Sequence, residues 1–324
     1  MPMSAAPLSS VRPGTVAEAP DALLSGIAPL PQLGVISVQG DDGPKFLHGL
    51  LSQDFLQLDA THARLAALCS AKGRMQASFI ALRRGADEIL LVCSRDLLPA
   101  TLKRLAMFVL RAKVRLSDAS DAYALFGIVG DAIDSRANEL GEPWAVAAFG
   151  DALRVTLYPA DGRPRALWIA PAGAAAPPGA ALGAGLWDWG EVRSGVATLT
   201  AAVVDTFVPQ MLNYESVGGV NFHKGCYPGQ EVVARSQFRG TLKRRAHLAH
   251  CERLLLAGEE LFHDSDPSQP CGRVAQAAPA PLGGCDAIVS VQVQAAASGA
   301  IRAGASDGAP LTLLPLPYPL LQDV

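Results

Sequence analysis

The sequence predicts an α+β fold made mainly of antiparallel strands. Three observations favour it: apolar runs of strand length are separated by turns rich in glycine and aspartate, a few stretches repeat at the helical spacing, and the segment after Lys243 holds only short apolar runs. The chain has 324 residues, of which 50% are hydrophobic and 18% charged, so it is globular and can form two or three folding units.

The first unit is expected within residues 33–120. LGVISVQG (33–40) is typical of a strand, and Asp41-Asp42 can cap a helix whose apolar positions follow the helical spacing: Phe46, Leu47, Leu50 and Leu51. Three further strands are predicted at 64–70, 74–84 and 88–94, separated by turns at 71–73 and 85–87. A helix over 98–109 and a strand over 113–120 complete the unit.

A second, similar unit is expected up to residue 170. YALFGIVG (123–130) predicts a strand, 134–141 resembles the helical part of the first unit, and 153–171 predicts two strands around an Asp161-Gly162 turn. The low-complexity segment 171–185 is expected to be a flexible connector. LWDWGEVRSGVA (186–197) then opens another helix.

The two ends of the chain differ in composition from these units. Residues 1–28 are rich in Ala, Pro and Ser and lack the pattern of a signal peptide, so we expect a flexible tail. Residues 243–324 predict a small β-barrel. Apolar segments are broken well before membrane-spanning length, and the six cysteines are scattered without a C-x-x-C pair. These features predict a soluble, cytoplasmic protein without a metal site, and the net charge of -3 gives no overall attraction to nucleic acid.

The segment FHKGCYPGQEVVAR (222–235) holds the most informative cysteine, Cys226. Pro228 and Gly229 occupy the central positions of a type II turn, and a short helix or strand follows from Gln230. Amide groups at a helix start, together with Lys224, would favour the thiolate form of Cys226. The alternative is a buried packing residue, which is the common role of a free cysteine.

Other candidates have two interpretations each. His223 could pair with Cys226 or contribute to a metal site, but a turn histidine in contact with solvent is favoured. Gln230 and Glu231 could hydrogen-bond a heterocycle or cap the local turn. Trp187 could stack on a flat ring or pack in a core. A basic run could bind an anion or be a solvated face; it comprises Arg235, Arg239, Lys243, Arg244 and Arg245.

With these residues in view, the sequence resembles the YgfZ-type folate-binding proteins, relatives of the glycine-cleavage T-protein that assist iron–sulfur enzymes. The most specific segment is KGCYPGQE (224–231), and further similarity lies in 38–54, 70–79 and 207–222. The resemblance covers roughly residues 30–245. It implies a ring of two ferredoxin-like α+β units and a C-terminal barrel around a central folate pocket, with residues 29–242 forming the folate-binding region.

The resemblance also implies site residues. Cys226 is expected to be the essential side chain, and tetrahydrofolate or another folate the cofactor. Trp187 matches one folate-contacting tryptophan of the family, whereas the other falls near Leu33, which has no ring. The expected cofactor contacts are Leu33, Trp187, Glu191, Arg193, Lys224, Gly225, Tyr227, Gly229, Gln230, Glu231 and Arg235.

Two departures from the T-protein argue against aminomethyl transfer. Ala77 and Ser78 stand where the transferases carry an acidic pair, so an acid/base group is missing. Arg193 stands where they carry a pterin-binding glutamate, so Glu191 would have to supply that carboxylate. The leading hypothesis is a folate-binding accessory protein that supports iron–sulfur clusters in client enzymes, with an indirect effect on tRNA modification. The alternatives are a one-carbon transferase and an RNA-binding module.

Overall fold

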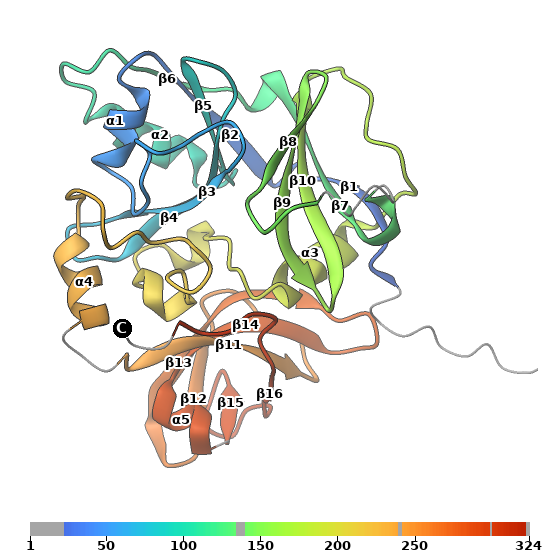
Figure 1. Cartoon of the computed structure of the whole chain (residues 1–324). Coiled ribbons are helices and arrows are strands. Elements are labelled where there is room, and N and C mark those ends of the chain that lie inside the picture. Colours follow the sequence, from blue (N-terminus) through green and yellow to red (C-terminus); the bar gives the residue numbers. More distant parts are fainter. Residues whose placement is uncertain (1–22, 134–139, 239–241, 299, 322–324) are drawn as a thin grey trace, which may run out of the picture.

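The computed structural model describes residues 23–133, 140–238, 242–298 and 300–321. Three antiparallel sheets surround a middle segment that contains the helix α3, so the α+β prediction is confirmed (Figure 1). The described helices are α1 (Gly43–His48), α2 (Leu98–Ala106), α3 (Ala184–Arg193), α4 (Gln230–Phe238) and α5 (Val293–Ser298), with short 3-10 turns at Ser120–Ala122, Gly130–Ala132, Ala201–Val203 and Pro209–Leu212.

The first sheet has the strand order β3-β4-β5-β2-β6. Its strands are β2 (Leu33–Gln39), β3 (Arg64–Cys69), β4 (Met75–Arg83), β5 (Glu88–Ser94) and β6 (Arg115–Asp118). One face packs with apolar residues of α1 and α2, and alternate residues such as Val35 and Val92 enter the central core. Because both faces are buried, these strands are continuous apolar runs in the sequence.

The start of α1 differs in one detail from the prediction. Asp42 occupies the N-cap position but makes no side-chain cap hydrogen bond. Its carboxylate instead accepts the backbone N–H of Lys113 at 2.7 Å, which ties the helix start to the segment before β6. Leu50 and Leu51, expected within the helix, lie buried just after its end.

The second sheet has the order β8-β9-β10-β7-β1 and repeats the topology of the first except at its last strand, β1, which comes from the start of the chain whereas β6 follows β5. In each sheet three strands that are consecutive in the sequence lie side by side, β3-β4-β5 or β8-β9-β10. The strand next to β5 or β10 in the sheet is β2 or β7, which comes earlier in the sequence. The strands are β1 (Gly26–Pro29), β7 (Tyr123–Val129), β8 (Val146–Phe149), β9 (Ala152–Ala160) and β10 (Arg163–Pro171). The turn between β9 and β10 has positive φ at Asp161 (48°) and Gly162 (75°), as a tight hairpin requires.

Two predictions about chain segments need correction here. Residues 26–28, assigned to the flexible tail, form strand β1 (Gly26–Pro29) together with Pro29, because they pair with β7. The connector is not free of the fold, since Ile27 N–H donates to the Ala180 carbonyl and Leu182 N–H to that of Ile27, both at 2.8 Å, and Leu182 is buried. Most of the expected helical segment 134–141 lies outside the described residues.

The C-terminal region is one curled sheet with the order β15-β12-β13-β14-β11-β16. Its strands are β11 (Arg244–Cys251), β12 (Glu260–His263), β13 (Asp266–Pro279), β14 (Cys285–Gln292), β15 (Ile301–Ala303) and β16 (Thr312–Leu314). The segment before β16 pairs with β15, through Ala303 N–H to Ala309 O at 2.9 Å, and then continues along β11. One segment therefore connects the two edges of the sheet, which resembles a half-barrel.

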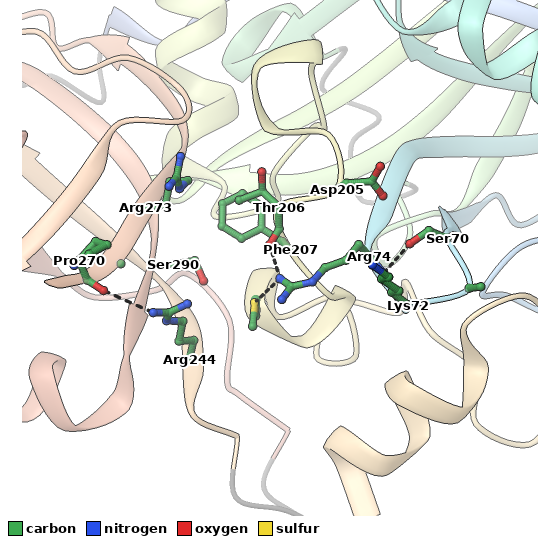
Figure 2. Close-up of a pocket in the computed structure, with 13 residues that line it drawn as sticks. Ser70, Lys72, Arg74, Asp205, Thr206, Phe207, Arg244, Pro270, Arg273 and Ser290 are labelled. Atoms are coloured by element: carbon green, nitrogen blue, oxygen red, sulfur yellow. Dashed lines mark hydrogen bonds between the residues drawn. The ribbon is translucent and has the colours of Figure 1, made fainter.

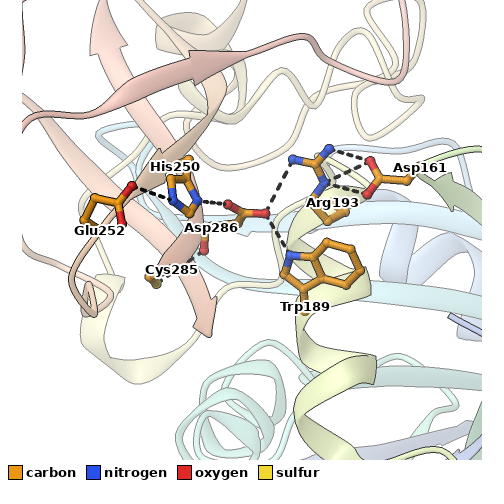
Figure 3. Close-up of polar contacts among 7 residues, drawn as sticks. All are labelled: Asp161, Trp189, Arg193, His250, Glu252, Cys285 and Asp286. Atoms are coloured by element: carbon orange, nitrogen blue, oxygen red, sulfur yellow. Dashed lines mark hydrogen bonds and ion pairs between the residues drawn. The ribbon is translucent and has the colours of Figure 1, made fainter. Parts of the chain in front are cut away.

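A polar network joins α3 to the sheets on both sides of it (Figure 3). Asp286 on β14 accepts hydrogen bonds from Trp189 Nε1 and from His250 Nδ1, both at 2.7 Å. Arg193 forms a forked pair with Asp161 of the second sheet and also lies 3.5 Å from Asp286. Because Asp286 is only 5% exposed, these contacts are shielded from water and fix α3 between the second and third sheets.

Candidate functional site

The cysteine turn, residues 224–230, has the predicted geometry. Gln230 N–H donates to the Tyr227 carbonyl at 3.1 Å, and Gly229 has φ of +80°. A Cβ on Gly229 would lie 2.3 Å from the carbonyl oxygen of Ser70, so both the backbone conformation and the close packing require glycine. The segment after the turn is the helix α4, which settles the open choice between helix and strand.

Lys224 anchors this turn to the first unit. Its ammonium donates hydrogen bonds to the carbonyl oxygens of His48 and Leu51, the second at 2.8 Å, and lies 4.6 Å from the ring centroid of Tyr227. Lys224 is 8% exposed, and burial lowers its pKa to about 8, although Asp54 and Cys226 act in the opposite direction. From the sequence, Lys224 is expected to favour the thiolate of Cys226 and to contact folate; the structure adds that Lys224 is buried and anchors the turn.

Cys226 is exposed, as predicted, while the other five cysteines, all in the described part of the chain, are buried. Burial raises the pKa of Cys69 and of Cys93 to about 12. The turn therefore presents one accessible thiol between a buried lysine and the buried Tyr227.

A histidine that the sequence analysis did not single out lies beside this turn. His48 Nδ1 is 2.9 Å from Asp54 Oδ1, and that carboxylate oxygen also accepts the N–H of Leu56 at 2.9 Å. The other ring nitrogen of His48 lies 3.2 Å from the position that a Cβ on Gly225 would occupy. A carboxylate thus orients an imidazole next to Gly225, the residue that precedes Cys226. His223, the histidine considered from sequence, is exposed, as favoured.

A central cavity lies where the first two units meet α3. Three of the predicted folate contacts line it, Leu33, Trp187 and Glu191, which brings these distant residues together. Arg165 lies between two of these residues: its guanidinium is 4.5 Å from the ring centroid of Trp187 and donates to Glu191. Complete burial lowers the pKa of Arg165 to about 9.

The lining of the central cavity fits a folate in its chemistry but not in its volume. Glu191 is a carboxylate that can accept hydrogen bonds from a heterocycle, and Trp187 offers an aromatic ring on which one could stack. The volume is about 50 Å³, whereas ligand sites usually measure about 300–1,000 Å³. Arg165 and the backbone of Gly127, where a Cβ would lie 2.4 Å from the indole, both pack against Trp187. A heterocycle that stacks on the face of Trp187 covered by Arg165 would have to displace that guanidinium.

The remaining predicted contacts lie elsewhere. Arg193 belongs to the network with Asp161 and Asp286 and does not line the central cavity. Arg235 forms an exposed pair with Glu231 at 2.6 Å. The other cysteine-turn residues predicted as folate contacts are likewise not among the lining residues: Lys224, Gly225, Tyr227, Gly229 and Gln230.

The basic run does not form one surface in the described residues. Arg245 pairs with the buried Glu215 at 2.7 Å, whereas Arg244 lines a different and larger cavity (Figure 2). Arg239 lies outside the described residues. Adjacent positions of this run therefore have different roles.

Comparison with known proteins identifies the family, although no family model matches the chain. The tRNA-modifying protein YgfZ of Edwardsiella ictaluri (strain 93-146) is 31% identical over 301 residues, which cover 87% of this chain and 89% of that protein. This chain belongs to the YgfZ family. YgfZ of Vibrio vulnificus (strain YJ016) is 30% identical over 223 residues, or 66% of this chain and 67% of that protein.

Comparison with a solved structure also supports the T-protein-like fold. The glycine cleavage system aminomethyltransferase T from Bartonella henselae superposes with a TM-score of 0.69 at 15% identity, covering 92% of this chain and 88% of that structure. The predicted T-protein-like arrangement is therefore confirmed, and it extends beyond residue 245 into the curled C-terminal sheet of this YgfZ-family chain. None of its described helices has the length and apolarity needed to cross a membrane.

Proposed function

We propose that this YgfZ-family chain is a folate-binding accessory protein that supports the assembly or repair of iron–sulfur clusters in client enzymes, with Cys226 as its reactive side chain. An effect on tRNA modification follows through cluster-dependent enzymes. The observation that carries the proposal is the cysteine turn, in which Lys224 and Tyr227 are buried while Cys226 is exposed. Such a turn holds a thiol rigidly where another molecule can reach it.

Complementation tests the role of Cys226. In a deletion strain that lacks its own YgfZ protein, the wild-type chain should restore iron–sulfur enzyme activity and Cys226→Ala should not. The variant should keep its melting temperature, because removal of a small exposed side chain opens no cavity. His223→Ala changes an exposed neighbour on the same loop and should complement fully. Full complementation by Cys226→Ala would remove the thiol from the proposed function.

Folate binding is supported by family membership and by the lining of the central cavity, and it requires Arg165 to leave Trp187. Tetrahydrofolate should quench tryptophan fluorescence, and Trp187→Phe should lose most of that quenching while it preserves an apolar ring in the core. Arg165→Met should increase the affinity, because it removes a buried guanidinium from the space a ring would enter. An absence of binding to the wild-type chain would contradict the folate part of the proposal and leave the thiol part to the complementation test.

Neither alternative function gains support from the site. Ser78 accepts the N–H of Leu199 at 2.9 Å, Ala77 is apolar, and Glu191 is the one carboxylate among the described residues that line the central cavity. We therefore expect no aminomethyl transfer, which an ammonia-release assay with aminomethylated carrier protein and tetrahydrofolate would measure. An RNA-binding module would need a continuous basic surface, and the pairing of Arg245 with Glu215 interrupts the basic run.

A further inference from the structure

A large cavity, the basic cavity, lies between the first unit and the C-terminal sheet (Figure 2). Its volume is about 840 Å³, within the usual range for ligand sites. One wall is the hairpin 70–74 between β3 and β4, a second is the segment 205–211, and the third is formed by β11, β13 and β14. It shares no lining residue with the central cavity.

The lining of the basic cavity carries an excess of positive charge. Four cationic side chains contribute to it, Lys72, Arg74, Arg244 and Arg273, against one carboxylate, Asp205. The formal charge of the whole chain is -3, so this concentration of positive charge is local. A concave surface lined by one sign of charge focuses the field and attracts ions of the opposite sign.

Three of these cations have no carboxylate partner within the described residues. Lys72 is exposed and has no hydrogen bond or ion pair there. Arg74 donates to the Thr206 carbonyl, and Arg244 donates to that of Pro270 at 3.4 Å. Arg245, next to Arg244 in the sequence, is by contrast paired with Glu215. The missing carboxylates leave positive charge on two walls that a bound anion would neutralise.

The strand register explains how the sheet wall is built. Ser290 pairs with Arg273, and Gln292, two residues further along β14, pairs with Arg244. Paired residues of antiparallel strands project to the same side, and so do residues two apart, so both arginines and Ser290 share one face. Ser290 is 1% exposed, lines the cavity, and its hydroxyl has no hydrogen-bond partner in the described structure. A buried hydroxyl of this kind gains a partner if a ligand oxygen binds beside it.

We propose that the basic cavity binds a small anion that carries at least two phosphate or carboxylate groups. Hydrogen-bond donors dominate the lining, and they lie on opposite walls, Lys72 and Arg74 on the hairpin and Arg244 on the sheet. A ligand with separated acceptor groups satisfies both walls at once, whereas a single monovalent ion satisfies one. The site uses neither Trp187 nor Glu191, so it is independent of folate binding in the central cavity.

Isothermal titration calorimetry on the full chain at low ionic strength tests this site with two probes, sodium tripolyphosphate and a tri-γ-glutamate peptide. Lys72→Gln and Arg244→Gln should each weaken binding about tenfold, and the double variant about a hundredfold, because each removes one charge-assisted contact. Lys103→Gln is the matched control, since Lys103 is exposed on α2 and outside the cavity. Ser290→Ala should weaken binding without lowering the melting temperature, because its hydroxyl makes no hydrogen bond that the change would break.

The two probes also distinguish the source of the anion. Binding of tripolyphosphate alone assigns the site to phosphate groups, binding of the peptide alone assigns it to carboxylates, and binding of both supports a site for either chemistry. If neither probe binds, or if the double variant binds as tightly as Lys103→Gln, the proposal is wrong.

Discussion

Selective alkylation of Cys226 follows from the burial of the other cysteines. Iodoacetamide reacts with the thiolate form of cysteine, so the rate depends on the pKa of the thiol and on access to the sulfur. We expect one equivalent of reagent to add to the native chain, at Cys226, well before any second addition.

The size of the difference can be worked out from the pKa values. With a pKa of about 12, Cys69 and Cys93 each form about one thiolate in 10,000 molecules at pH 8. A thiol with the reference pKa of about 8.5 is about one quarter thiolate at that pH. The thiolate fraction alone therefore gives an unperturbed thiol an advantage of about 2,500-fold over these two, and burial of their sulfur atoms adds to it.

Intact-mass spectrometry would count the additions, and peptide mapping would locate them. Cys226→Ser should take up almost no reagent in the same time, and unfolding in guanidinium should make all six cysteines of the wild-type chain react. Equal rates of labelling at Cys226 and Cys69 in the native chain would refute the reasoning.

Three further predictions concern the groups around the site. His48→Gln should slow alkylation of Cys226 at pH 7 severalfold and change its pH profile, because the imidazole held by Asp54 lies beside the turn. Asp286→Asn should destabilise the fold by about 2–4 kcal/mol, measured by calorimetry, because a buried charge that accepts two short hydrogen bonds is lost. For Lys224, the pKa falls from 10.5 to about 8 on folding, so between pH 8 and 10.5 the unfolded chain binds more protons. The free energy of unfolding should therefore rise with pH across that window, and it should rise less in Lys224→Met.

Each of these predictions has an outcome that contradicts it. An unchanged pH profile in His48→Gln would leave His48 with only a structural role. Asp264→Asn, which removes a half-exposed partner of Arg302, is the control for Asp286→Asn. Equal losses of stability in the two variants would show that the buried network stabilises the fold no more than an exposed ion pair does. Identical pH slopes for the wild-type chain and Lys224→Met would show that the ammonium is not desolvated.

The fold was predicted best where the signal is local. The strands β2 to β5 and the β9–β10 hairpin are apolar runs bounded by turn residues, so both their ends and their partners follow from neighbouring sequence. β1 was missed because GIAP lies in a segment rich in alanine and proline and becomes a strand only through pairing with β7, about a hundred residues away.

For the candidate site, too, features set by neighbouring residues could be predicted and features set by distant packing could not. The turn at Pro228-Gly229 and the exposure of Cys226 follow from the residues of one short segment. The approach of His48 to Gly225 depends on how α1 packs against that segment, and no spacing in the sequence reports it. The burial of Lys224 could not be predicted for a related reason, because its hydrogen-bond partners are backbone carbonyls, which every residue carries.

Arg193 has a structural role in this chain that differs from the ligand-binding role that the T-protein resemblance implies for its position. The T-protein resemblance puts a pterin-binding glutamate at this position, and an arginine has no acceptor to offer a pterin. Here the guanidinium instead pairs with Asp161 and with Asp286, which holds α3 against the second sheet and the C-terminal sheet. Because α3 also carries Trp187 and Glu191, these two residues are fixed in place. A ligand that enters the central cavity must therefore displace Arg165 on β10 rather than move α3, so the affinity for folate should depend more on residue 165 than on residue 193.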